Sequence, residues 1–432
     1  MRHLWRNESF QKYFQNTGWL FLEKVARLVV TLTVWALVIR YLGPEQFGVF
    51  SYALSFIFLF GMLVDLGMEQ VLVKDLVEQP GRSNVFLGSA FVLRILGFSL
   101  ASILIAISVH FWVKDPVTKI VIYIMSGRLF FMAFNNIDSY FQSRVLSKYT
   151  VYSQMLSLCL TSVLCLLFVY GHKSLFYFVW IVVLEAASTV GWLMLFYQRF
   201  SKSRWIFDPT VIRQLLYRSW PLVISGFAIS IYMRLDQLMI KHMIGNAAVG
   251  QFAVAVRVSE AFYFIPMAAT ASLFPAIVLS KTKDQKIYYN RLTSINTLLI
   301  WISLAISVMM SMYGSSLIRL LFGDNYLPAI PVLLIHIWAS IFVFLGVMRS
   351  KWAINEGLQN LIMVYTILGA VINVALNVVL IPHWGILGAA IATVVAQCFV
   401  ATISNLLHPK SRPMFFLQLN AFNPVYLFRN RW

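Results

Sequence analysis

Six basic side chains lie inside long apolar stretches of this sequence, where a charge is costly to bury. They are Lys24, Arg27, Arg94, Arg128, Arg234 and Arg257. A basic residue at the centre of a membrane-spanning helix costs roughly 2.5 to 3.5 kcal/mol, so six that faced lipid would cost on the order of 15 to 21 kcal/mol. This exceeds the stability of a typical domain. We therefore expect these cations to be paired or to face an interior cavity, where they could bind an anion such as a diphosphate.

The spacing of the first four cations indicates which of them could act together. Lys24 and Arg27 are three positions apart, so they share one face of a helix and could grip a diphosphate. An alternative stays open, because Glu23 lies four positions before Arg27 and could neutralise it, while Lys24 could reach the membrane surface. Arg128 has no acidic residue within one helical turn, and Arg94 lies deep in its apolar stretch. We assign all four to the candidate substrate-binding set.

The last two cations stand near acidic residues. Arg234 and Asp236 are two positions apart and lie on different faces of a helix, so each needs a partner from another helix or from water. Arg257 and Glu260 are three positions apart, and pairing between them is the alternative to contact with a substrate. Both cations remain candidates for substrate binding.

Acidic residues in the apolar stretches are candidates for coupling to ions or for gating. They are Asp65, Asp138, Glu185, Asp236 and Glu260. Asp138 and Glu185 are isolated in surroundings that favour the protonated form, so they could carry protons; partnership with a cation is an equal alternative. Asp65, with Glu69 one turn later, lies where an apolar stretch ends and favours a gating role. We expect His336 to be a hydrogen-bonded core residue.

No other group of residues has the spacing of a catalytic or metal site. The three cysteines lie in apolar runs without a CxxC pair or histidines at ligand spacing. Asn373 and Asn377 are one helical turn apart, and buried amides at such spacing ordinarily hold membrane helices together.

Membrane-spanning helices must position these residues. Of the 432 residues, 60% are apolar and only 12% are charged, and a span needs roughly 20 mostly apolar residues. Charge clusters and turn residues divide the chain into twelve such segments. They run approximately over 17–39, 47–69, 85–112, 118–141, 150–170, 175–197, 220–241, 249–279, 292–313, 328–348, 358–381 and 385–407. We predict an all-α integral membrane protein with about twelve transmembrane helices.

The net charge of +18 predicts how these helices are oriented. The termini and every second connection carry 22 of the 34 basic residues, whereas the other connections carry only six. Basic residues accumulate on the cytoplasmic side of membrane proteins. Both termini, and the basic tail over 408–432 that we expect to rest on anionic lipid, are therefore placed in the cytoplasm.

The chain divides into two halves of six spans each. The longest cytoplasmic connection, 198–219, contains Asp208-Pro209, a helix-start signal, followed by a short amphipathic helix expected to lie on the membrane surface. The turns that follow the first span of each half share a weak pattern at a constant offset. We predict two six-helix lobes, 1–208 and 209–432, related by a pseudo-two-fold axis along the membrane normal.

An ordered set of short motifs covers both halves. It includes Asn16-Thr-Gly-Trp19, Arg40-Tyr-Leu-Gly-Pro-Glu45, Arg234-Leu-Asp236-Gln, Phe322-Gly-Asp-Asn-Tyr326, Ile381-Pro382 and Gly388-Ala-Ala390. This set resembles bacterial O-antigen (Wzx-type) flippases. These are polysaccharide transporters of the MOP superfamily, which also contains multidrug exporters of the MATE type and lipid II flippases.

The resemblance implies translocation of undecaprenyl-pyrophosphate-linked repeat units from the cytoplasmic to the periplasmic leaflet of the bacterial inner membrane, in O-antigen and lipopolysaccharide biosynthesis. It implies lobes that alternate in access to a cationic central cavity. The expected partners are the lipid-linked glycan, membrane lipid, and polysaccharide polymerase and chain-length proteins, but no nucleic acid. We expect no cofactor, metal or catalytic residue, and an ion gradient, of protons in particular, as the energy source, since no GxxxxGK[ST] loop is present.

Two alternatives remain. A polysaccharide polymerase or glycosyltransferase would use the same lipid-linked sugars, but such enzymes generally need a large periplasmic loop, and the longest here is about 14 residues, 314–327. A MATE-like small-molecule exporter of cations would favour an acidic interior, whereas these spans contain more bases than expected for that cargo.

Overall fold

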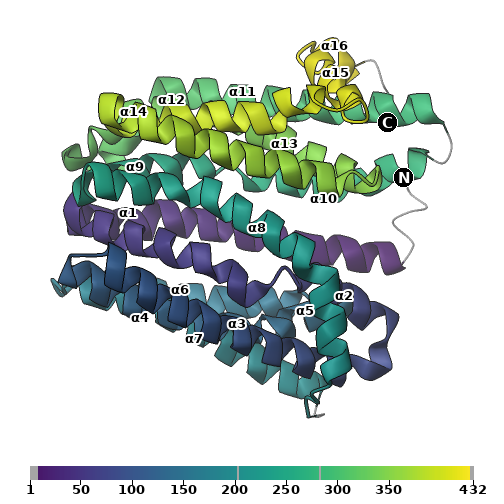
Figure 1. Ribbon diagram of the computed structural model, residues 1–432, viewed down its shortest axis with the longest axis horizontal. Coiled ribbons are helices and arrows are strands. Elements are labelled where there is room, and N and C mark those ends of the chain that lie inside the picture. Colours follow the sequence, from purple (N-terminus) through teal and green to yellow (C-terminus); the bar gives the residue numbers. More distant parts are fainter. Residues whose placement is uncertain (1–7, 202–203, 282–283, 429–432) are drawn as a thin grey trace. The chain divides into compact units, whose positions relative to one another are not determined.

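Helices account for almost the whole chain (Figure 1). The computed structural model describes residues 8–201, 204–281 and 284–428, and these ranges contain no strand. Within the described residues, 10 helical segments are long and apolar enough to cross a membrane. Two of these segments, 21–78 and 359–406, contain a glycine with non-helical backbone and provide two crossings each. The predicted all-α membrane fold is confirmed, with the number of spans that hydropathy indicated.

The chain forms two compact units, residues 1–230 (unit 1) and 231–432 (unit 2). Unit 1 contains α1 (Glu8–Asp65), α2 (Glu69–Glu78), α3 (Ser83–Trp112), α4 (Pro116–Met132), α5 (Asn136–Ser143), α6 (Lys148–Tyr170), α7 (Leu175–Phe200) and the first part of α8 (Pro209–Met243). Unit 2 contains the rest of α8 and α9 (Asn246–Glu260), α10 (Phe264–Lys281), α11 (Gln285–Phe322), α12 (Ala329–His336), α13 (Ala339–Asn355), α14 (Gln359–Ala401), α15 (Arg412–Asn420) and α16 (Val425–Phe428). Short 3-10 turns cover Pro80–Arg82, Ala133–Asn135, Asp324–Tyr326 and Ile403–Leu406.

Two glycines make the turns inside the longest helices. Gly43 in α1 has φ 68° and is followed by Pro44, and Gly385 in α14 has φ 58° and comes shortly after Pro382. A positive φ is disfavoured for residues with a Cβ, and proline removes a donor from the helical ladder. Each turn therefore ends one span and begins the next.

Breaks within single spans are a feature that hydropathy did not predict. The span expected over 249–279 is interrupted between α9 and α10, and the one expected over 328–348 between α12 and α13. Each break directly follows a polar residue, Glu260 or His336. In unit 1, α4 and α5 are separated in the same way shortly before Asp138. Broken spans often mark binding sites in transporters, because unwound backbone is tolerated where it lines a polar cavity.

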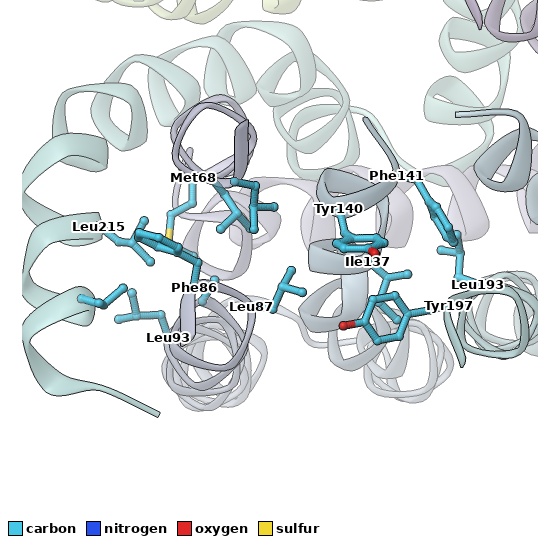
Figure 2. Close-up of a cluster of buried hydrophobic side chains, with 14 residues drawn as sticks. Met68, Phe86, Leu87, Leu93, Ile137, Tyr140, Phe141, Leu193, Tyr197 and Leu215 are labelled. Carbon is cyan, nitrogen blue, oxygen red and sulfur yellow. The ribbon is translucent and has the colours of Figure 1, made fainter. Parts of the chain in front are cut away.

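The first part of α8 belongs to unit 1, and unit 2 begins at residue 231. The predicted lobe boundary at 208/209 stays a prediction. Arg218 Nη1 donates to Asp75 Oδ1 at 2.7 Å. Leu215 joins a buried apolar cluster with residues of α3, α5 and α7 (Figure 2). The expected amphipathic helix is therefore present, but its apolar face packs on protein rather than on lipid alone.

Asp208 begins α8 as the Asp-Pro signal predicted. Its Oδ1 accepts hydrogen bonds from the backbone N of Thr210 at 2.8 Å and from its Oγ1 at 2.6 Å, while Arg82 Nη2 lies 3.6 Å from Oδ2. The hydrogen bonds from Thr210 hold the pKa of this exposed carboxyl below its usual value. The ionised form therefore caps the helix at neutral pH.

The tail that we expected to rest on lipid over 408–432 folds against unit 2 as far as it is described. Helix α15 packs on α11 and on the turn that follows α14 (Figure 1). Asn405 Nδ2 donates to the buried Oε1 of Gln418 at 3.3 Å. Arg429 and Arg431, which contribute to the predicted cytoplasmic charge, lie outside the described residues.

Candidate functional site

Arg27 on α1 lies between two carboxylates. Its Nε donates to Glu23 Oε1 at 2.6 Å, one turn earlier in the same helix, and its Nη1 donates to Glu185 Oε1 on α7 at 2.8 Å. Lys24 Nζ lies 3.2 Å from Glu23 Oε2, and the Lys24 side chain is otherwise exposed. The local pairing with Glu23 that the spacing allowed is confirmed, and Glu185 adds a partner that local spacing could not indicate.

Arg128 on α4 belongs to the same group. Helices α1, α4 and α7 pack against one another, and the Arg128 guanidinium interacts electrostatically with Glu185 and Arg27. The side chain is exposed, and no described carboxylate forms an ion pair with it. We call Lys24, Arg27, Arg128, Glu23 and Glu185 the unit 1 cluster. Its three positive and two negative charges leave a net positive group in which guanidinium forks can bind phosphate oxygens.

Arg94 on α3 is fully buried, unlike the cations of the unit 1 cluster. Its Nη2 donates to Asp65 Oδ1, at the end of α1, at 2.9 Å. Its Nε and Nη1 have no hydrogen-bond partner among the described residues. In this structure Arg94 therefore positions Asp65, and its role as a substrate contact stays a prediction.

Asp138 on α5 is held in a second polar network. Its Oδ1 accepts from Thr150 Oγ1 at 2.6 Å, and its Oδ2 accepts from Gln142 Nε2 at 3.1 Å. Gln142 Nε2 also donates to Glu69 Oε1 at 2.9 Å. Arg94 lies within electrostatic range of both carboxylates. Two of the three predicted gating and coupling acids of unit 1, Asp65 and Asp138, therefore lie around one buried cation, whereas the third, Glu185, pairs with Arg27.

Asp236 on α8 lies in a buried set of neutral polar side chains. Its Oδ2 accepts from Thr393 Oγ1 at 2.6 Å, and its Oδ1 accepts from Asn377 Nδ2. Asn377 Nδ2 also lies 3.2 Å from Asn373 Oδ1. The predicted role of these amides in joining helices is confirmed, because they connect α14 to α8. Carboxylate, amide and hydroxyl oxygens can hold a proton or a hard cation, whereas the described residues contain no cluster of His, Cys, Asp and Glu suited to a metal ion.

Arg234 and Glu260 form an ion pair between α8 and α9. The distance from Arg234 Nη2 to Glu260 Oε2 is 3.2 Å, and about a fifth to a quarter of each side chain is exposed. Arg234 and Asp236 thus each have partners on another helix, as their spacing required. Arg257 lies in the last turn of α9, on the same helix as Glu260, and its pairing with Glu260 or with a substrate stays a prediction.

Polar groups also meet where the spans of unit 2 are broken. Ser259 Oγ lies 2.7 Å from His336 Nδ1, which joins the two breaks and confirms His336 as a hydrogen-bonded core residue. Gln397 Nε2 donates to Tyr232 Oη at 2.8 Å. Sequence reasoning missed this second pair, because a lone Tyr and a lone Gln in apolar runs give no spacing signal.

Arg349 directly follows the span predicted over 328–348 and is one of the 22 basic residues counted in the predicted cytoplasmic connections, but the structure places it elsewhere. It lies within α13 and is buried, because that helix continues to Asn355 beyond the end of the apolar run. Its Nη1 donates to the carbonyl of Val400 and, at 3.2 Å, to Ser404 Oγ. Val400 lies in the last turn of α14, where unpaired carbonyls favour a cation. Arg349 therefore caps α14.

The described residues form a helical membrane fold with charged side chains within the apolar spans of both units. Solved structures share the fold across nearly the whole chain. The inward-facing conformation of a multidrug resistance MATE family transporter of the MOP superfamily aligns with a TM-score of 0.70 at 15% identity, covering 92% of this chain and 99% of that one. Lipid II flippase MurJ in its inward closed conformation aligns with a TM-score of 0.69 at 15% identity, covering 96% and 92%.

Sequence comparison shows the family to which this chain belongs. The profile of the polysaccharide biosynthesis protein family matches residues 13–283, more than half of the chain, and the protein belongs to this family. An uncharacterized membrane protein of Methanocaldococcus jannaschii is 23% identical over 418 residues, 89% of this chain and 81% of its own. A probable low-salt glycan biosynthesis flippase of Haloferax volcanii is 28% identical over 190 residues, 42% of this chain and 39% of its own.

Proposed function

We propose that this protein flips an undecaprenyl-diphosphate-linked oligosaccharide, such as an O-antigen repeat unit, from the cytoplasmic to the periplasmic leaflet of the bacterial inner membrane without altering it chemically. Membership of the polysaccharide biosynthesis family supports a glycan as the transported substrate. The transporter fold supports movement across the membrane. The similarity to a protein named as a probable glycan biosynthesis flippase supports both the glycan substrate and its movement across the membrane. Polymerase and chain-length proteins, which would use the delivered repeat unit, are the proposed partners.

The observation that carries this proposal is the unit 1 cluster. Arg27 and Arg128 come from neighbouring helices, and each lies away from the ends of its span. Substrate sites of transporters lie near the middle of the membrane. Two guanidinium groups, each able to bind two oxygens, suit the two phosphates of a diphosphate. The net positive charge of the cluster disfavours a cationic drug as cargo.

The energy source that we propose is an ion gradient, with Asp236 as the coupling group. A carboxylate buried among amides and a hydroxyl can exchange a bound ion when the protein changes conformation. Protons are the proposed coupling ion. If a sodium gradient drives transport and a proton gradient does not, this part of the proposal is wrong.

Complementation of a flippase-deficient strain tests the function. Arg27→Gln, Arg128→Gln and Arg257→Gln should each abolish surface polysaccharide while protein remains in the membrane, because each removes a cation from the substrate path. Arg319→Gln, which changes an exposed residue at the end of α11, should complement as the wild type does. Normal polysaccharide in all three variants would contradict the proposal.

A further inference from the structure

Glu185 occupies the position in the unit 1 cluster that an anionic ligand would take. It accepts a hydrogen bond from Arg27 at 2.8 Å and interacts electrostatically with Arg128, so one carboxylate serves two guanidinium groups on two other helices. Glu185 is the carboxylate whose charge acts on Arg128, and no described carboxylate lies within ion-pair distance of that guanidinium.

The two glutamates that contact Arg27 differ in their surroundings. Glu23 is 2% exposed and lies on the same helix as Arg27, which makes it a fixed partner. Glu185 is 28% exposed and comes from a different helix. Movement between α1 and α7 would therefore separate Arg27 from Glu185 while its contact with Glu23 persists.

The charges of the cluster indicate what Glu185 does during transport. Three cations and two glutamates leave one positive charge when the site is empty. A diphosphate diester brings about two negative charges, so the loaded cluster has one negative charge. With Glu185 neutral, the loaded cluster would be balanced, but the empty one would have two uncompensated positive charges. Charges within a membrane span are costly when they have no counter-charge, and Glu185 keeps both the empty and the loaded state within one charge of neutrality.

We propose that Glu185 stands in for the substrate's diphosphate while the site is empty, so that the unloaded protein can change conformation and return for the next substrate. This inference rests on the proposed function and assigns a step of the transport cycle to one side chain. When the diphosphate arrives, it takes over Arg27 and Arg128 from Glu185. When the diphosphate leaves, Glu185 pairs with Arg27 again and balances the guanidinium charge during the return.

The first test measures binding of undecaprenyl diphosphate to purified protein in detergent. Glu185→Gln keeps an oxygen that can accept from Arg27 but removes the competing charge, so it should bind roughly tenfold tighter than the wild type. Glu78→Gln, the same change at an exposed acid at the end of α2, should leave this affinity unchanged. If the wild type binds no undecaprenyl diphosphate, the proposed function fails; if it binds but Glu185→Gln binds no tighter, only the role of Glu185 fails.

The second test separates the return of the empty protein from movement of the loaded one. Labelled undecaprenyl diphosphate is placed in one leaflet of proteoliposomes, with or without unlabelled lipid in the other. The Glu185→Gln variant should transport the label when unlabelled lipid in the opposite leaflet can load the site for the return step. Without that lipid its transport rate should fall at least roughly tenfold, because the empty site then has no internal anion. The wild type should depend little on lipid in the opposite leaflet.

Glu185→Asp keeps the charge and should restore most of the unassisted movement. Equal losses in the Asp and Gln variants under both conditions would show that Glu185 has only a structural role. An unchanged rate in Glu185→Gln without opposing lipid would also overturn the proposal.

Discussion

Arg27 and Arg94 have the same side chain, yet the structure gives them different surroundings. Arg94 is fully buried and has one carboxylate partner, Asp65, whereas Arg27 is partly exposed and has two, Glu23 and Glu185. A buried cation with its counter-ion ties helices together, and a partly exposed one can exchange its partner for a ligand. Exposure of the guanidinium therefore distinguishes a positioning residue from a binding one, although both occupy apolar stretches of sequence.

Two substitutions of Asp236 can separate its proposed role in proton coupling from its contribution to stability. Asp236→Leu leaves the buried donors of Asn377 and Thr393 without an acceptor, so we expect a loss of roughly 1 to 3 kcal/mol of stability for each. Asp236→Asn keeps the shape and one acceptor oxygen, so its thermal unfolding in detergent should stay close to that of the wild type. Its transport in vesicles should nevertheless no longer respond to an imposed proton gradient. A preserved response would exclude Asp236 as the coupling residue.

At the scale of elements, close approach of helices depends on positions without a side chain. A Cβ on Gly97 of α3 would overlap the backbone carbonyl of Leu63 in α1. Small residues permit such approaches in membrane proteins, where helix packing rather than hydrophobic burial holds the bundle together. The same contact region contains Asp65 and Arg94, so the distance between α1 and α3 also affects their ion pair.

Gly97→Ala should therefore destabilise unit 1 by roughly 1 to 3 kcal/mol, because the two helices must move apart. Gly191 of α7 is the matched control, since a Cβ there meets no atom within 4 Å. Gly191→Ala should be neutral or stabilising by about 0.5 to 1 kcal/mol, since alanine favours a helix more than glycine does. Thermal unfolding of both variants in detergent distinguishes these outcomes, and equal midpoints would refute the packing argument.

The whole molecule shows which features sequence can predict. Membrane spans follow from length and hydropathy, because every backbone polar group in lipid must be satisfied within its own helix. Partners such as Arg27 and Glu185 are 158 positions apart, and no local spacing reveals which distant helices will pack together. The break after His336, over Ile337 and Trp338, contains no proline or glycine, and Arg349 is buried because its helix continues beyond the apolar run. Candidate residues and the local pairing of Arg27 with Glu23 could be predicted from sequence, but the pairings between distant helices required the fold.

Orientation in the membrane is a property of the whole chain, and the distribution of its charge predicts it. Twelve crossings predict that both termini are on one side, and the excess of basic residues in alternate connections predicts that this side is the cytoplasm. A fluorescent protein fused after Asp208 should fluoresce, whereas alkaline phosphatase fused after Asp324, which follows α11, should be active in the periplasm. Exchanging the two reporters should silence both fusions. Because the proposed flippase loads its lipid from the cytoplasmic leaflet, the opposite pattern would reverse the direction of transport as well as the topology.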